Sequence, residues 1–254
     1  MSPDAAPWIA ALFGLLVGSF LNVCIFRLPR KESIVWPASR CPRCGRALAW
    51  YENVPVVSWV LLRARCRMCG ERISWMYPIV ELCTAIVFAA LFTLYGPTPL
   101  GLSRLVFACS LIVLFAIDLE YQLLPNVITL SGIVIGLLFS VFVPPGWVDS
   151  LIGIVLGGAV PYAIAEAYFR LRGEEGLGMG DVKMLAMIGA FLGWKLMLLT
   201  LVLASFAGSV VGLGFLAAGY GRRFALPFGT FLAAGAVVAA IRGDAMLAWY
   251  LSHY

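Results

Sequence analysis

Long apolar runs separated by short polar segments constrain this sequence more than any other feature. The candidate membrane spans are residues 8–26, 78–95, 102–119, 127–143, 151–169, 182–192, 196–218 and 227–241. A membrane-crossing helix needs roughly 20 apolar residues. The sixth run is too short for a full crossing unless Gly193 and Trp194 continue it, or unless it is a half-helix covered by protein. The pattern predicts an all-α polytopic membrane protein with about eight transmembrane helices.

The composition supports this interpretation. Hydrophobic residues make up 62% of the 254 residues, and charged residues only 12%. Ordinary soluble domains are about 45–50% apolar and about 25% charged. The composition therefore excludes a disordered tail, a domain that binds nucleic acid through a basic face, and a water-soluble enzyme. The excess apolar surface is expected to face membrane lipid.

Basic residues are concentrated in one polar segment. Ten of the 18 Lys and Arg residues fall within residues 27–72. Cytoplasmic loops collect Lys and Arg, so we expect this segment to be cytoplasmic, where it would also attract anionic lipid. Eight crossings would then place both termini outside and 15 of the 18 cations inside. The first apolar run has no preceding cation, so it is interpreted as a retained helix and not as a signal peptide.

Two cysteine pairs lie within the basic segment. Cys41, Cys44, Cys66 and Cys69 form the pattern C-x2-C-x21-C-x2-C, and a glycine follows each pair. Four thiolates at this spacing are typical of tetrahedral Zn²⁺, and a site without an open position is structural. A redox dithiol is the alternative. The remaining three cysteines lie in apolar runs, where cysteine usually behaves as a small hydrophobic residue.

Two aspartates stand at the ends of apolar runs. Asp118 closes the third run, and Asp181 opens the sixth within the sequence Gly178-Met-Gly180-Asp181. By the expected topology both lie at the cytoplasmic boundary, where two carboxylates can meet across a cleft. An aspartic protease needs such a pair, because one carboxylate deprotonates water while the other polarises the peptide carbonyl. The alternative is that each aspartate is only a helix cap.

Other ionisable residues near the spans have structural interpretations. Glu81 is expected to reach the interface or to make a polar contact, and Glu166 to pair with Arg170. Lys183 either pairs with Asp181 or extends toward the interface. The only histidine, His253, lies near the C-terminus. A Ser-His-Asp enzyme or an HExxH zinc protease is therefore excluded.

An ordered set of motifs resembles a known family, the type IV prepilin peptidases, which are bifunctional leader peptidase/N-methyltransferases. The set begins at residues 14–23 and 27–29 and continues through both cysteine pairs. The remaining motifs are residues 77–82, 117–118 with 124–125, 176–183, and 227–232.

The resemblance implies an aspartic peptidase of the GxGD type in the bacterial inner membrane. Members of this family cut the leader from prepilins and pseudopilins on the cytoplasmic side. They then methylate the new N-terminal amine with S-adenosylmethionine. Carried over by motif, the catalytic pair is Asp118 and Asp181. The zinc ligands are Cys41, Cys44, Cys66 and Cys69.

The expected organisation has three parts. Residues 1–26 form the first transmembrane helix, residues 27–77 the cytoplasmic zinc-binding domain, and residues 78–254 the transmembrane peptidase core. The apolar helix of the prepilin is expected to enter laterally between spans, with its junction to the leader between the two aspartates. Nearby acids are expected to assist binding of the cationic leader, namely Glu120, Glu174 and Glu175.

Two positions depart from the family pattern. Asn126 stands where many members have aspartate, and this change is interpreted as harmless. Ala64 stands where many members have glycine, in a region associated with methylation. A peptidase without methylation is therefore one alternative. A proton- or cation-coupled membrane carrier is the alternative from another class, although no internal repeat typical of transporters is visible.

Overall fold

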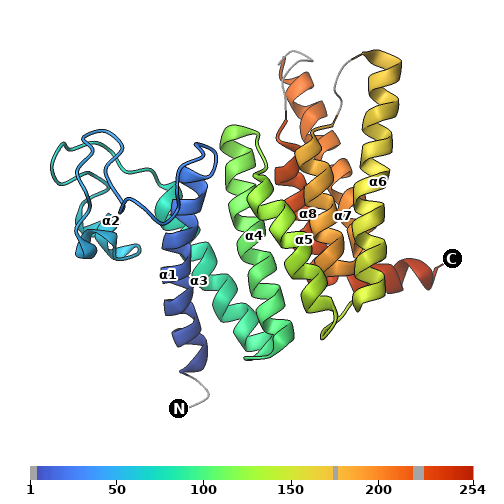
Figure 1. Cartoon of the computed structure of the whole chain (residues 1–254), viewed down its shortest axis with the longest axis horizontal. Helices are drawn as coiled ribbons and strands as arrows, with labels where there is room; N and C mark the ends of the chain where they lie inside the picture. Colours follow the sequence, from blue (N-terminus) through green and yellow to red (C-terminus); the bar gives the residue numbers. More distant parts are fainter. Residues whose placement is uncertain (1–4, 174–176, 220–225, 254) are drawn as a thin grey trace. The chain divides into compact units, whose positions relative to one another are not determined.

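The computed structural model describes residues 5–173, 177–219 and 226–253 (Figure 1). Within these ranges the chain is helical and has no strand, which confirms the predicted all-α fold. The elements are α1 (Ala6–Arg27), η1 (Trp50–Asn53), α2 (Val57–Leu61), α3 (Met76–Tyr95), α4 (Pro99–Tyr121), α5 (Asn126–Ser140), α6 (Trp147–Arg172), α7 (Met179–Ala217) and α8 (Phe228–Leu251).

The described residues include six helices long and apolar enough to cross a membrane, namely α1, α3, α4, α6, α7 and α8. The chain is thus a multi-pass membrane protein. The apolar α5 has only 15 residues. The predicted number of about eight is larger because it counts α5 and because α7 contains both the sixth and the seventh predicted spans.

A break at Gly193 divides α7 into two segments. Gly193 has φ 77° and ψ 172°, which is not helical, and its positive φ favours glycine. Asp181 and Leu185 of the first segment line the same cavity as Leu201 and Ser205 of the second. The second segment therefore runs back alongside the first. The two segments of this hairpin correspond to the sixth and seventh apolar runs. The sixth run is short because the helix turns back at Gly193.

The first segment of α7 is enclosed by protein. Every residue from Met184 to Gly193 is buried. A Cβ atom on Gly153 of α6 would lie 2.6 Å from the carbonyl oxygen of Gly189, and one on Gly132 of α5 would clash with Met187. Glycines on α5 and α6 thus let both helices approach α7 closely, which satisfies the requirement that a short helix in lipid be covered.

The chain divides into two compact units, Met1–Val113 and Leu114–Tyr254. In the first unit α1 packs on α3 (Figure 1), and Asn22 donates a hydrogen bond of 3.0 Å to the carbonyl oxygen of Tyr77. In the second unit α7 packs against α5, α6 and α8. The boundary between the units falls within α4. The division into parts 1–26, 27–77 and 78–254, which follows spans and loops, remains a prediction.

Candidate functional site

The four cysteines of the two CxxC pairs come together in the first unit. Their Sγ atoms all lie within 4.8 Å of one another. The two loops have the same backbone pattern. In the first loop, Cys41 N–H donates to Arg46 O at 2.9 Å and Gly45 N–H to Cys41 O at 3.0 Å. In the second, Cys66 N–H donates to Glu71 O at 2.7 Å and Gly70 N–H to Cys66 O at 2.9 Å.

This donor set fits a metal ion that prefers thiolates. Gly45 and Gly70 both have φ 70°, so the backbone can turn around the sulfur atoms as predicted. The backbone N–H groups of Cys69 and Met68 lower the pKa of the Cys66 thiol to about 6. The Glu71 N–H lowers the pKa of Cys69, but burial and the neighbouring thiols raise it to about 11, so Cys66 forms the thiolate that metals bind before Cys69 does. The cluster could therefore hold a metal ion, and four sulfur donors leave no open position for a water.

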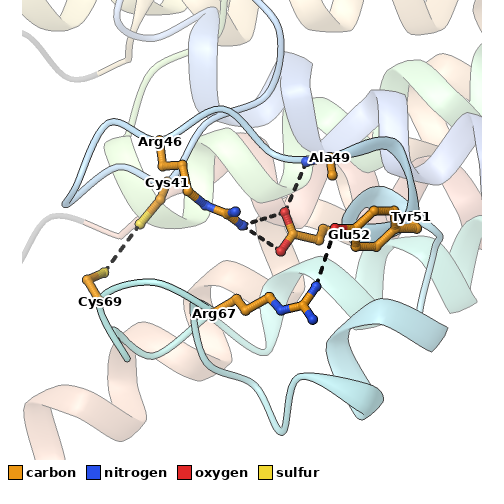
Figure 2. Close-up of polar contacts among 7 residues, drawn as sticks. All are labelled: Cys41, Arg46, Ala49, Tyr51, Glu52, Arg67 and Cys69. Atoms are coloured by element: carbon orange, nitrogen blue, oxygen red, sulfur yellow. Dashed lines mark hydrogen bonds and ion pairs between the residues drawn. The ribbon is translucent and has the colours of Figure 1, made fainter.

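Polar contacts beside this cluster order the segment between the cysteine pairs (Figure 2). Arg46 forms an ion pair with Glu52, whose side chain is only 2% exposed. The carboxylate of Glu52 also accepts the Ala49 N–H at 3.0 Å. Together these two donors hold the pKa of Glu52 below its ordinary value. On the second loop, Arg67 donates to the Tyr51 hydroxyl at 3.3 Å.

Glu81 joins the same segment to the helices of the first unit. Its carboxylate is buried in α3 and accepts the Val56 N–H at 2.7 Å. Ser19 and Asn22 of α1 also hydrogen-bond to it. The expected polar contact is therefore present, but its partner is a backbone group 25 residues away in the sequence.

Asp118 lies near the end of α4 and is only 5% exposed. Its Oδ2 atom accepts two hydrogen bonds from Thr230 of α8, one from the backbone N–H at 2.7 Å and one from Oγ1 at 3.1 Å. The Gly229 N–H also acts on this carboxylate. A Cβ atom on Gly229 would lie 3.0 Å from the Asp118 carboxylate, so a side chain at this position would displace the carboxylate.

Asp181 lies in the first turn of α7, and its N–H bonds to Gly178 O at 3.0 Å. The side chain of Leu124 lies against both Gly180, which precedes Asp181, and Gly229, which faces Asp118. A Cβ atom on Gly180 would lie 2.9 Å from Leu124 Cβ, and one on Gly229 would lie 3.0 Å from Leu124 Cδ1. The charge of Asp118 also acts on Asp181. The structure thus brings the two carboxylates into one neighbourhood of the second unit, and each is preceded or faced by a glycine.

Two family models match the chain. The model of the bacterial peptidase A24 N-terminal domain matches residues 12–95, and that of the type IV leader peptidase family matches residues 105–213. A prepilin leader peptidase/N-methyltransferase of Aeromonas salmonicida (strain A449) is 36% identical over 97% of this chain and 95% of its own length. The chain belongs to the type IV leader peptidase family.

Further relatives of this leader peptidase family carry the same name. The relative from Pseudomonas putida is 36% identical over 98% of this chain and 94% of its own length. The relative from Myxococcus xanthus (strain DK1622) is 43% identical over 80% of this chain and 61% of its own length. No solved structure matches the chain. The resemblance stated from the sequence motifs is confirmed, and the chain is an enzyme of the leader peptidase class.

Lys183 has a partner that the sequence did not indicate. It donates a hydrogen bond of 2.9 Å to the Asn126 amide oxygen and forms no ion pair with Asp181 among the described residues, so Asn126 serves as a neutral acceptor. Glu166 pairs with Arg170 at 2.8 Å, as predicted. Glu120 is exposed. Glu174 and Glu175, the other acids expected to assist leader binding, lie outside the described residues.

A cavity of about 380 Å³ adjoins Asp181 in the second unit. It lies between α6, α7 and α8, and sequence reasoning did not identify it because its walls come from residues distant in the chain. Most of the wall is apolar, and Asp181 is the only carboxylate among the described residues that line it. The lining residues are Pro161, Ile164, Ala165, Tyr168, Leu177, Asp181, Leu185, Leu201, Ser205, Phe228 and Leu232.

Proposed function

We propose that this enzyme cleaves the leader peptide of type IV prepilins or pseudopilins with Asp118 and Asp181 as its catalytic pair, and then methylates the new N-terminal amine. The observation that carries the proposal is the shared neighbourhood of the two carboxylates, in which the charge of Asp118 acts on Asp181. The names of the relatives at 36–43% identity supply the substrate class and both reactions.

The chemistry needs one ionised and one protonated carboxylate. The ionised carboxylate removes a proton from a water molecule, whose oxygen attacks the carbonyl carbon of the scissile peptide bond. The protonated carboxylate donates a hydrogen bond to the carbonyl oxygen. When the tetrahedral intermediate collapses, the C–N bond breaks, and the leaving amine takes the proton that the first carboxylate had removed from water. Two aspartates that interact electrostatically share one proton in this way.

The substrate is proposed to approach Asp181 from the apolar cavity between α6, α7 and α8. An apolar wall offers no partner to a cationic leader, whereas it suits the apolar helix that follows the cut. The junction between leader and helix would then lie between Asp118 and Asp181. The tyrosine and serine in the wall, Tyr168 and Ser205, leave it polar enough to admit water.

The reaction is proposed to take place on the cytoplasmic side of the bacterial inner membrane. The support is the concentration of ten Lys and Arg residues in residues 27–72, since cytoplasmic loops are rich in these residues. The topology expected from the sequence puts both aspartates at that same boundary.

The four cysteines are proposed to bind structural Zn²⁺ through Cys41, Cys44, Cys66 and Cys69. When bound, the ion cross-links the two loops and takes no part in proton transfer. S-adenosylmethionine is the proposed methyl donor. Ala64 adopts φ 56°, a conformation that favours glycine, so it preserves the backbone that glycine gives many family members. This observation favours retained methylation over a peptidase without methylation.

The proposal is tested with the purified protein, a prepilin and S-adenosylmethionine, and the products are weighed by mass spectrometry. The native protein should release the leader and add one methyl group, while Asp118→Asn and Asp181→Asn should lose cleavage by at least about 10³-fold. The control is Asp244→Asn, which makes the same substitution at an aspartate of α8 that has no proposed role in cleavage. Cleavage by both active-site variants would contradict the catalytic pair, and cleaved product without the added methyl would contradict the second activity.

A further inference from the structure

Thr230 directs two donors at a single oxygen of Asp118. The hydroxyl and the backbone N–H of the same residue both bond to Oδ2, at 3.1 and 2.7 Å. Thr230 is the third residue of α8, where backbone N–H groups have no partner within their own helix. A backbone N–H at the start of α8, which has no partner within its own helix, therefore bonds to the carboxylate of Asp118, 112 residues earlier in the sequence.

Two donors directed at Oδ2 stabilise a full negative charge on that oxygen more than they stabilise a neutral carboxyl group. The Gly229 N–H also acts on this carboxylate, and the positive end of the α8 dipole lies beside it. These donors stabilise a negative charge on Asp118, whereas its burial opposes that charge. Asp181 has a different environment, because it lines a mostly apolar cavity and has the charge of Asp118 nearby.

We infer that Thr230 is a positioning residue that holds Asp118 as the ionised member of the pair, so that the shared proton lies on Asp181 before substrate arrives. The inference rests on the proposed catalytic pair and assigns its two roles. Asp118 is then the base that activates water, and Asp181 donates to the carbonyl oxygen of the scissile bond.

Few other charged or titratable groups face this carboxylate. Asp181 and Lys183 lie on the first segment of α7, and Glu120 and Tyr121 follow Asp118 on α4. Neither α5 nor the first 13 residues of α8 contain an ionisable side chain. Lys183 bonds to Asn126, and Glu120 is exposed. Thr230 is therefore the side chain that a substitution can change without altering the charge of the site.

The test compares three variants of the full-length enzyme in cleavage of a prepilin. Thr230→Val removes the hydroxyl donor but keeps the side-chain shape and the backbone N–H. We expect kcat to fall about tenfold, the value of a hydrogen bond to a charged group, with KM within about twofold. Thr230→Ser keeps the hydroxyl and should stay within about threefold of the native kcat. Thr200→Val is the matched control, because the Thr200 hydroxyl bonds only to the carbonyl oxygen of Leu196.

The pH profile separates positioning from a general loss of structure. Because the hydroxyl favours the ionised form of Asp118, its removal should move the acid limb of kcat to higher pH by about one unit. A Thr230→Val enzyme with native kcat and an unmoved acid limb would overturn the inference, as would equal losses in the Val and Ser variants. Full cleavage by Asp118→Asn would instead overturn the catalytic pair itself.

Discussion

Gly153 of α6 and Gly189 of α7 touch backbone to backbone, since a Cβ atom on Gly153 would lie 2.6 Å from the Gly189 carbonyl oxygen. The next turn repeats the contact, with a Cβ on Gly157 placed 2.7 Å from the carbonyl oxygen of Leu185. This close packing holds the first segment of α7, which carries Asp181 in its first turn, against α6. The hydrophobic effect does not drive helices together in lipid, so their association depends on van der Waals packing. Small residues allow this packing because they let the two backbones come close.

A methyl group at this contact should separate the helices. We expect Gly153→Ala to lower the thermal midpoint of the purified enzyme in detergent by several degrees and to reduce cleavage at least about tenfold, because overpacking costs about 1–3 kcal/mol. Gly158→Ala on the same helix is the control, since a Cβ there meets nothing within 4 Å. Equal midpoints for the two variants would contradict the close packing.

Removal of the metal should release the segment between the cysteine pairs. We expect one Zn²⁺ per chain by elemental analysis, and its loss on chelation or in Cys66→Ser should make residues 27–77 sensitive to protease. Cys83→Ser, an exposed cysteine of α3, should keep the metal and the resistance. If the native protein contains no metal and instead forms a reversible disulfide among these cysteines, the redox alternative is correct.

Glu81 should hold the α2 region in place through the Val56 N–H. Glu81→Ala leaves this N–H without its acceptor, and an unsatisfied buried donor costs about 1–3 kcal/mol. Hydrogen exchange in residues 54–62 should therefore rise about tenfold or more. Glu81→Gln keeps an oxygen acceptor and should show a smaller rise. Unchanged exchange in both variants would show that the bond contributes nothing to local stability.

Ala64→Gly should have little effect on the zinc segment. The positive φ of Ala64 costs about 1 kcal/mol, and glycine would relieve it but would also gain a similar amount of entropy in the unfolded chain. Ala47, which lacks a positive φ, is the control, and Ala47→Gly should lower stability by about 0.5–1 kcal/mol. The methylated fraction of product should be the same for Ala64→Gly and the native enzyme, because the backbone already has the required conformation.

The features that follow local spacing could be predicted from the sequence. The four cysteines, the two glycine turns and the Glu166–Arg170 pair depend on residues close in the chain, and hydropathy marks each helix without knowledge of its neighbours. Helix ends were less accurate. The last apolar run ends at residue 241, whereas α8 continues to Leu251.

The contacts of the acidic residues could not be predicted in the same way. The partner of Asp118 is 112 residues away, and no periodicity relates a threonine in the first turn of one helix to the end of another. Val56, whose N–H bonds to Glu81, has φ 60°, a conformation that its β-branched side chain disfavours and that the sequence therefore does not predict. The hairpin in α7 was visible in the sequence only as a sixth apolar run too short for a full crossing, followed closely by a seventh, because a single residue, Gly193, makes the turn.

Because residues 184–193 are enclosed by protein, the position of Asp181 does not depend on the thickness of the surrounding bilayer. A helix exposed to lipid responds to hydrophobic mismatch by tilting or by deforming the bilayer. The 14 residues from 179 to 192 extend only about 21 Å, and their position is set by glycine contacts with α5 and α6. Bilayers with short or long acyl chains would therefore change the tilt of helices that are exposed to lipid. The Asp181 carboxylate would keep its position relative to α5 and α6.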